Sequence, residues 1–446
     1  MFRWEMYMSF KNLGVHAAVI PALESAGIKS AFPIQSATLP DAIAGRDILG
    51  RGQTGSGKTL AFGLAMITRL ANRKAEPFRP IGLILSPTRE LAMQISDAIA
   101  PLARCVNLNT QVIVGGLGYS RQIQGLRRGV PIVVATPGRL LDLMKKEGLR
   151  LDSVEITVLD EADQMSDMGF LPVVKEILSQ TKSDGQRMLF SATLDRDVDA
   201  LVKRFLKNPK THSVANVAKN EGKMAHHVLI MDPGDKDKIS TQIAARAGRT
   251  IFFVRTKHGA DRLVEKMLRV GVSAGALHGG KSQNQRTRIL EAFKSGSTRA
   301  LIATDVAARG IHVDDVSLVV HVDSPENPKD YLHRAGRTAR AGAEGVVVTL
   351  ATAGQRRGIH GMTAKAGVTL KESKVRPMDA NLVSITGAIE PSGIAVITKP
   401  EVAERGNQRS RRPGSRHGAQ RRQGGQRSFK GGKKPGGKGR ERRPAK

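Results

Sequence analysis

Residues 52–59 read Gly52-Gln53-Thr54-Gly55-Ser56-Gly57-Lys58-Thr59, a glycine-rich loop of the form G-x-x-x-x-G-K-[ST]. Backbone N–H groups and the lysine of such a loop surround phosphate groups. The preceding Asp47-Ile48-Leu49 reads as the end of a short strand, and residues 60–70 show a helical pattern. Because bound phosphates lie at the N-terminus of a helix, the order strand, glycine loop and helix favours a nucleotide site.

A second stretch, Asp160-Glu161-Ala162-Asp163, closes the apolar run Ile156-Thr157-Val158-Leu159. An acidic pair at the end of a buried strand can hold Mg²⁺ and orient a water molecule. Alone, such a pair is usually an ordinary strand end or helix N-cap. Together with the glycine loop, it predicts hydrolysis of a nucleoside triphosphate.

The composition predicts a polyanionic partner. The chain has 446 residues, 40% of them apolar, which is enough for two or three domains with real cores. Its formal net charge is +31, of which residues 401–446 carry +13 from 16 Lys and Arg and 3 Glu. These last 46 residues contain 10 glycines and almost no apolar side chains. We therefore expect a disordered basic tail that tethers RNA, with a solubility role as the alternative.

The sequence has no feature of export or membrane insertion. Residues 1–10 lack a basic region followed by an apolar core, and no apolar run approaches eighteen residues. The single cysteine, Cys105, excludes an intramolecular disulfide and lacks an activating neighbour in the sequence. We expect a soluble cytoplasmic protein that does not bind membranes.

Short apolar strands alternate with helical patterns in two successive series, which predicts an α/β fold of two tandem parallel sheets. The first series is Ile81–Leu85, Val112–Val114, Ile132–Ala135, Ile156–Leu159 and Met188–Phe190; the second is Ile251–Val254, Ala274–Leu277, Ala300–Ala303, Leu318–Val322 and Val346–Leu350. Polar clusters follow the strands of the first series, where ligands bind in such sheets. We predict a nucleotide-binding domain over 1–208, a linker over 209–222, a second domain over 223–380, and a low-complexity basic tail over 381–446.

Two further motifs complete a resemblance. They are Ser191-Ala192-Thr193 and His333-Arg334-Ala335-Gly336-Arg337-Thr338-Ala339-Arg340. With the loop and the acidic stretch, they resemble the DEAD-box ATP-dependent RNA helicases, most closely the bacterial RhlE-type group, over roughly residues 10–350. The resemblance implies two RecA-like domains, ATP and Mg²⁺ as cofactors, and RNA as partner.

The resemblance also implies roles on the nucleotide. Gln35 reads the adenine edge, because an amide both donates and accepts, and Phe10 packs on the ring. Lys58 bridges the β- and γ-phosphates, Thr59 and Asp160 hold Mg²⁺ largely through water, and Glu161 deprotonates the attacking water. The remaining implied nucleotide contacts are Gly52, Gln53, Thr54, Gly55, Ser56, Gly57, Gly310 and His312.

The second domain is expected to complete the catalytic site. Arg337 and Arg340 match arginine fingers that stabilise charge on the transferring phosphoryl group. The resemblance implies that Asp163 connects the nucleotide site to the second domain. The residues implied in coupling hydrolysis to RNA are Asp163, Ser191, Thr193, Asp305 and His333.

The chain departs from the family pattern at several positions. It has Ala31-Phe32 where the family has Pro-Thr, and His312 where the family has Asp. A neutral histidine cannot accept two hydrogen bonds as a carboxylate can, so we expect weaker nucleotide binding. The motif Leu277-His278-Gly279-Gly280 lacks the Asp that the family places after His-Gly.

RNA contacts are implied for short hydroxyl, guanidinium and backbone donors, which suit sugar and phosphate. They are Pro87, Thr88, Arg89, Gly115, Gly116, Thr136, Gly138, Arg139, Thr256, Lys257 and Thr304. We expect binding independent of base sequence, and 2′-hydroxyl contacts would favour RNA over DNA. The resemblance also suggests ribosomal or mRNA-decay complexes as partners.

The leading hypothesis is an RNA-dependent ATPase that unwinds short RNA duplexes locally and remodels RNA or RNA–protein complexes as its two domains close. One alternative is an ATP-regulated RNA clamp or annealing chaperone with little unwinding. A DNA-translocating helicase is the third hypothesis, which the Asp-Glu-Ala-Asp form and the Gln35 motif disfavour.

Overall fold

The structure is a computed structural model that describes residues 8–52, 55–213, 224–308, 313, 315–339 and 344–396. Residues 397–446, which contain the Arg- and Gly-rich part of the predicted basic tail, lie outside the described residues. The RNA-tethering role of this tail is therefore still a prediction from composition alone.

The first half of the described chain forms a seven-stranded parallel sheet of order β3-β4-β2-β5-β6-β1-β7. Its strands are β1 (Ile48–Arg51), β2 (Gly82–Leu85), β3 (Thr110–Ile113), β4 (Ile132–Ala135), β5 (Ile156–Asp160), β6 (Gln186–Ser191) and β7 (Lys210–Ser213). Its helices are α1 (Ile20–Ser25), α2 (Pro33–Ile43), α3 (Lys58–Leu70), α4 (Arg89–Arg104), α5 (Tyr119–Arg127), α6 (Pro137–Glu147), α7 (Ala162–Asp167), α8 (Leu171–Ser179) and α9 (Arg196–Phe205), with a 3₁₀ turn at Ala17–Val19.

The second half repeats this topology. Its seven-stranded parallel sheet has the order β10-β11-β9-β12-β13-β8-β14, which becomes the order of the first sheet when each strand number is reduced by seven. Its strands are β8 (Met224–Ile230), β9 (Arg249–Phe253), β10 (Ala274–Leu277), β11 (Ala300–Ala303), β12 (Val316–His321), β13 (Gly345–Ala351) and β14 (Lys371–Lys374). Its helices are α10 (Lys236–Ala245), α11 (Lys257–Arg269), α12 (Gln283–Lys294), α13 (Asp305–Ala308), α14 (Pro328–Ala335), α15 (Arg356–Lys365) and α16 (Ala380–Thr386), with 3₁₀ turns at Pro233–Asp235 and Ala353–Gln355.

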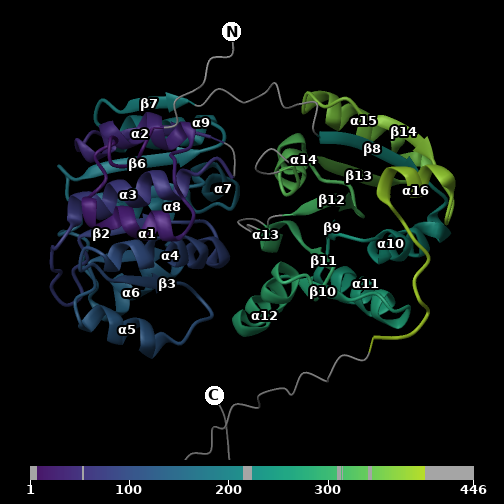
Figure 1. Cartoon of the computed structure of the whole chain (residues 1–446), viewed down its shortest axis with the longest axis horizontal. Helices are drawn as coiled ribbons and strands as arrows, with labels where there is room; N and C mark the ends of the chain where they lie inside the picture. Colours follow the sequence, from purple (N-terminus) through teal and green to yellow (C-terminus); the bar gives the residue numbers. More distant parts are fainter. Residues whose placement is uncertain are drawn as a thin grey trace, which may run out of the picture. The chain divides into compact units, whose positions relative to one another are not determined.

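Both faces of each sheet are covered, which explains the continuous apolar strands (Figure 1). In β2, Ile84 belongs to one core cluster while Leu83 and Leu85 belong to the cluster on the opposite face. In β9, Phe252 and Phe253 divide in the same way between two clusters of the second sheet. The alternation follows the two-residue period of a strand. The prediction of two α/β domains with parallel sheets is confirmed.

Parallel strands place the polar clusters together. The glycine loop follows β1, Ser86 follows β2, Thr136 follows β4, Asp160 ends β5, and Ser191 ends β6. All these strands run in the same direction, so the clusters lie at one edge of the first sheet. This is the arrangement that the sequence pattern predicts for a ligand site.

Two predicted boundaries need correction. Residues 210–213, assigned to the linker, form β7, which pairs with β1 from Lys210 to Ser213. The edge strand was missed because its side chains are largely polar and exposed. Residues 214–222, the part of the predicted linker that follows this strand, lie outside the described residues.

The start of the tail was also placed too early. Residues 381–396 are folded: Leu382 and Ala388 are fully buried in a core cluster of the second sheet. The backbone N–H groups of Gly393 and Val396 donate to the carbonyls of Val270 and Leu268 at 3.0 and 2.8 Å. The apolar residues of α16 give this segment a surface to bury, which the Arg- and Gly-rich residues beyond it lack.

No helix in the part of the chain that the structure describes combines the length and apolar character needed to cross a membrane.

Candidate active site

The glycine loop ends at Gly57, whose φ of 90° lies in the left-handed region that glycine adopts without strain. Lys58 then begins α3 and is only 5% exposed. Its Nζ donates to the carbonyl oxygen of Gly52 at 2.9 Å and to Oε1 of Glu161 at 3.0 Å. Ser56 Oγ is buried in the loop and has no hydrogen-bond partner among the residues that the structure describes. A buried ammonium, an unpaired hydroxyl and a helix N-terminus together form a cradle that suits an anionic phosphate.

The acidic stretch follows β5 through a strained turn. Asp160 is the last residue of the strand, and Glu161 has φ 53° and ψ 51°, a left-handed conformation that is uncommon for a non-glycine residue. The side-chain Nε2 of Gln164 donates to Oε2 of Glu161 at 3.1 Å. Glu161 is therefore held from one side by Gln164 and from the other by Lys58. Such backbone strain clusters at functional sites.

Lys58 and the carboxylates of this cluster interact electrostatically. Burial alone would lower the pKa of Lys58, but the nearby Glu161 and Asp160 outweigh it and raise that pKa. Burial raises the pKa of Asp160 to about 7, against the opposing charge of Lys58. Desolvated carboxylates of this kind are stabilised by a cation.

The donor set fits Mg²⁺. Within the described ranges, no group of three His, Cys, Asp or Glu side chains is arranged to hold a metal ion alone. Mg²⁺ in nucleotide sites usually takes one or two protein oxygen ligands, with the rest from phosphates and water. Thr59, in the first turn of α3, and the buried Asp160 provide such oxygens.

Asp163 connects the acidic stretch to the end of β6. Its Oδ2 accepts hydrogen bonds from both the backbone N–H and the hydroxyl of Thr193, each at 2.9 Å. Ser191 Oγ accepts from the backbone N–H of Asp163 at 3.3 Å and donates to the carbonyl of Thr193 at 2.7 Å. Gly52 N–H donates to the Ser191 carbonyl at 3.2 Å. A continuous hydrogen-bonded path therefore runs from the glycine loop to Thr193.

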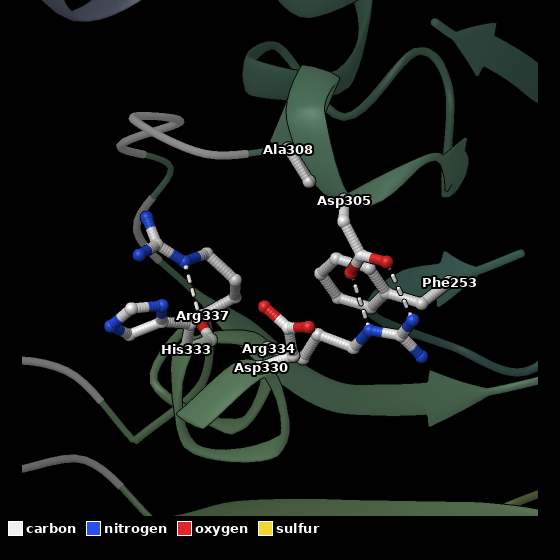
Figure 2. A pocket seen from close by; sticks show the side chains of 7 residues that line it. All are labelled: Phe253, Asp305, Ala308, Asp330, His333, Arg334 and Arg337. Carbon is white, nitrogen blue, oxygen red and sulfur yellow. Dashed lines mark hydrogen bonds and ion pairs between the residues drawn. The ribbon is translucent and has the colours of Figure 1, made fainter. Parts of the chain in front are cut away.

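A small pocket in the second half gathers Phe253, Asp305, Ala308, Asp330, His333, Arg334 and Arg337 (Figure 2). Arg334 makes a bidentate ion pair with Asp305 at 2.5 and 2.7 Å and lies over the Phe253 ring at 5.2 Å. Figure 2 shows Arg337 and His333 on the opposite side of the pocket, where Arg337 Nε donates to the His333 carbonyl at 3.1 Å. Arg334 fixes Asp305, a role that the sequence did not reveal.

His333 is a partly buried group that lies near the acidic stretch. Burial lowers its pKa, and the charges of Asp163 and Asp167 oppose that shift in part. Within the described ranges, its Nδ1 has no hydrogen-bond partner. The Asp163 carboxylate accepts hydrogen bonds from Gln164 and Thr193, both in the first half, and it interacts electrostatically with His333 of the second half.

The expected adenine contacts differ in exposure. Gln35 is 1% exposed; its Oε1 accepts from the Phe32 N–H at 2.8 Å, and its Nε2 donates to the Gly57 carbonyl at 2.9 Å. An amide so placed keeps one N–H and one lone pair for a ligand. Phe10 is 3% exposed and packs within the first core cluster. Gln35 therefore lies against the phosphate loop, whereas Phe10 lies in the core.

The residues expected to contact RNA lie near helix N-termini that follow strands. Thr88 caps α4 and Thr256 caps α11, accepting from the N–H groups of Leu91 and Gly259. Thr136 precedes α6, and Thr304 precedes α13. Backbone N–H groups at such ends bind phosphate, which agrees with contacts to the nucleic-acid backbone.

The fold places the Arg89 guanidinium against the backbone of Gly115 and Gly116. A Cβ on Gly116 would lie 2.6 Å from Nη1 of Arg89 and would displace the guanidinium, and the φ of 83° at Gly116 also favours glycine. Arg139 lies over the Tyr119 ring at 5.2 Å, and its buried Nη1 has no hydrogen-bond partner in the described part of the chain. Gly138 and Lys257 are exposed, and Pro87 is buried.

Several residues outside the predicted set join the two halves. Glu90 of α4 accepts from Arg286 Nε at 2.8 Å and from Gln283 Nε2 at 3.0 Å, and its second oxygen lies 2.8 Å from Arg286 Nη2. Lys329 Nζ lies 2.7 Å from Asp167 and 3.0 Å from Asp195. No sequence signal reveals these pairs, because their partners are distant in the chain.

Five predicted site residues, Gln53, Thr54, Gly310, His312 and Arg340, lie outside the described residues. Their roles remain predictions from the resemblance.

Comparisons with known proteins agree with this geometry. The DEAD/DEAH box helicase family matches residues 32–201, and the helicase conserved C-terminal domain matches residues 235–342. The chain is 39% identical to ATP-dependent RNA helicase RhlB of Pseudomonas syringae pv. tomato over 351 residues, 77% of this chain and 88% of that protein. It is 40% identical to DEAD-box ATP-dependent RNA helicase 3A, chloroplastic, of Zea mays, covering 81% of this chain and 50% of that longer protein. The solved structure of S. cerevisiae Dbp5 bound to RNA and ADP BeF3 matches with a TM-score of 0.74 and 30% identity, covering 84% of this chain and 97% of that one. The chain therefore belongs to the DEAD-box family of ATP-dependent RNA helicases, with two RecA-like domains.

Proposed function

We propose that this protein couples RNA-stimulated ATP hydrolysis to the local opening of short RNA duplexes, through closure of its two domains. The observation that carries the proposal is the hydrogen-bonded path from the glycine loop through Ser191 to Asp163 and Thr193. It joins the nucleotide cradle to the Ser191–Thr193 motif, so a change at one end alters the position of the other.

The cradle supports a defined chemistry. Phosphate oxygens compete with Glu161 for the protons of Lys58 Nζ, which now lies 3.0 Å from Oε1 of Glu161. Glu161 is then released from the ion pair while Gln164 still orients it. In that position it accepts the proton of the attacking water, as a general base does. When bound, Mg²⁺ held through Thr59 and Asp160 supplies positive charge to the phosphates.

Arg337 supports the second part of the site. It is 4% exposed and lies beside His333 at the end of α14. On closure, Arg337 and Arg340 stabilise the negative charge that develops on the transferring phosphoryl group, a contribution of about 10³-fold or more. Hydrolysis removes the γ-phosphate that these arginines contact, and the domains separate again.

The direct experiment is displacement of a strand from a short RNA duplex with and without ATP. We expect displacement that depends on ATP, and ATPase activity that RNA stimulates more than DNA does. The clamp or annealing hypothesis instead predicts RNA-dependent binding of ATP with no strand displacement. Absence of displacement in the presence of active ATPase would refute the proposed unwinding.

Glu161→Gln tests the catalytic assignment. The variant keeps the hydrogen-bonding shape but cannot take a proton, so it should bind ATP and RNA in the closed state without turnover. Glu24→Gln, an exposed residue of α1, is the matched control and should leave turnover unchanged. Normal turnover in Glu161→Gln would contradict the role of Glu161.

The basic tail is proposed as a sequence-independent RNA tether. Its charge of +13 over residues 401–446 should release counterions when it binds phosphates. Deleting these residues should weaken RNA binding and flatten its salt dependence, while the ATPase at saturating RNA is retained. Unchanged affinity at low salt would support the solubility role instead.

The physiological RNA is proposed to lie in ribosomal or mRNA-decay complexes, in the cytoplasm. Crosslinking the protein to RNA in cells and sequencing the bound RNA tests this assignment. Enrichment of neither class would reject it.

A further inference from the structure

Phe32 is an aromatic side chain in an unusual position. It is 52% exposed, and it is the one aromatic residue among the large apolar side chains that are exposed in the described parts of the chain. Exposure of a phenyl ring forgoes the stabilisation that burial provides. Core packing therefore does not account for Phe32.

The backbone of Phe32 is fixed to the phosphate loop through Gln35. Phe32 precedes the first turn of α2, and its N–H donates to Gln35 Oε1 at 2.8 Å. The other end of the same amide, Nε2, donates to the Gly57 carbonyl at 2.9 Å. One buried side chain thus ties the position of Phe32 to the last glycine before Lys58.

The ring itself packs against that glycine. A Cβ on Gly57 would lie 2.6 Å from Cδ2 of Phe32, so the ring occupies the space that any larger residue would need. Gly57 also has a positive φ of 90°, which disfavours a larger residue independently. The ring is therefore in contact with the phosphate loop on one side and remains half exposed.

We propose that Phe32 is a base-stacking residue, whose exposed ring contacts the purine of the ATP bound at the loop. The inference rests on nucleotide binding at the glycine loop and adds a residue that determines affinity for the base. An aromatic face stacks on any base, and the loss of one such contact weakens binding by about tenfold or more. Phe10, the residue that the resemblance assigns to the ring, is only 3% exposed in the core. Phe32 offers the accessible aromatic surface that Phe10 lacks.

The topology favours a nucleotide over an RNA base as the occupant. Helix α2, which Phe32 precedes, packs on β1 and β7 at one side of the first sheet. The first-domain residues expected to contact RNA follow β2, β3 and β4, which lie three to five strand positions from β1. At about 4.8 Å per strand, this is a lateral separation of roughly 14–24 Å. The glycine loop, by contrast, follows β1 directly.

The test compares a ligand that has a base with one that lacks it. Isothermal titration calorimetry measures the affinities of ADP and inorganic pyrophosphate for the full-length protein and for Phe32→Ala, Phe32→Leu and Phe32→Tyr. We expect Phe32→Ala to weaken ADP binding by about tenfold and to leave pyrophosphate binding unchanged. Phe32→Leu keeps apolar contact but has no π-face and should resemble Phe32→Ala, whereas Phe32→Tyr should resemble the unmodified protein.

Steady-state kinetics provide a second readout. In Phe32→Ala, KM for ATP should rise by about tenfold, while kcat at saturating ATP and RNA should change by less than about twofold, because stacking acts equally on ground and transition states. Ile394→Ala, which truncates the most exposed of the large apolar side chains described, is the matched control and should change neither value.

Three results would overturn the inference. Equal losses of ADP and pyrophosphate affinity would mean that Phe32 only shapes the loop, and unchanged ADP affinity would mean that it has no binding role. A loss of RNA affinity in the absence of nucleotide would assign the ring to RNA. If Phe32→Ala lowers the Tm, the ADP affinities of Phe32→Leu and Phe32→Tyr are compared instead, and equal affinities would contradict stacking. Absence of strand displacement by the unmodified protein would reject the proposed unwinding but would leave this comparison intact.

Discussion

Replacing Arg286 with Ala tests whether the two domains act together. Arg286 of α12 and Glu90 of α4 form a buried ion pair, with side-chain exposures of 9% and 2%. Two nitrogens of the guanidinium contact the carboxylate, each at 2.8 Å, and Gln283 adds a third contact at 3.0 Å. The pair is therefore desolvated, bidentate and supported by a neutral donor.

The expected magnitude follows from this burial. Removing one partner of a buried ion pair costs about 3–5 kcal/mol, because the other charge stays desolvated. When the domains separate, Glu90 is exposed to water again. The free-energy cost of leaving it unpaired therefore destabilises only the state in which the two domains are in contact. At about 1.4 kcal/mol per tenfold, a loss of about 3 kcal/mol reduces the joined population roughly a hundredfold.

The assay is RNA-stimulated ATPase as a function of RNA concentration. Arg286→Ala should lower the rate at subsaturating RNA by about a hundredfold, while affinity for ADP without RNA is unchanged. Arg288→Ala is the matched control, because Arg288 lies exposed on the same helix. The double variant Glu90→Ala with Arg286→Ala should be less impaired than the sum of the single effects. Equal activity of Arg286→Ala and Arg288→Ala, with equal Tm, would refute the reasoning.

Three other side chains provide further tests. Lys329→Ala removes two partly exposed ion pairs of about 0.5–1 kcal/mol each, so RNA-stimulated ATPase should fall about fivefold in low salt and less in high salt; no change at low salt would exclude a role in closure. Gln164→Leu removes the 3.1 Å hydrogen bond to Glu161 and should lower kcat about tenfold with little change in KM; a KM effect alone would place Gln164 in binding. Burial, followed by the charge of His227, lowers the pKa of His226 to about 4 from 6.5. The unfolded chain therefore binds more protons than the folded one between these pH values, and the Tm should fall as the pH is lowered through this window. His226→Gln should flatten that dependence, and an equally steep dependence in the variant would assign it to other groups.

Local sequence was sufficient to predict much of the fold. The continuous apolar runs predicted the central strands, and β4, β10 and β11 have the predicted bounds. The polar edge strands β7 and β14 were not predicted, because their residues lack the apolar pattern that marks a buried strand. Helix α16 was missed because its composition alone does not show that Leu382 enters the core.

The site residues likewise differ in whether the sequence can predict their arrangement. The glycine loop and Asp160–Glu161 are contiguous in the sequence, so their residue types and spacing predict the cradle and the acidic edge. Arg334 with Asp305, and Gln164 with Glu161, depend on side chains that folding brings to hydrogen-bonding distance. Their pairing leaves no periodic or compositional signal.

The chemistry proposed for this protein can be predicted from local sequence, because the phosphate loop and the acidic stretch each fix their geometry within a few neighbouring residues. The tertiary structure determines which aromatic ring is accessible, since burial depends on contacts made by the whole domain: Phe10 enters the core and Phe32 stays exposed beside Gly57. It also decided that Lys58 is paired with Glu161, because the two residues lie on different elements that only the parallel sheet brings together.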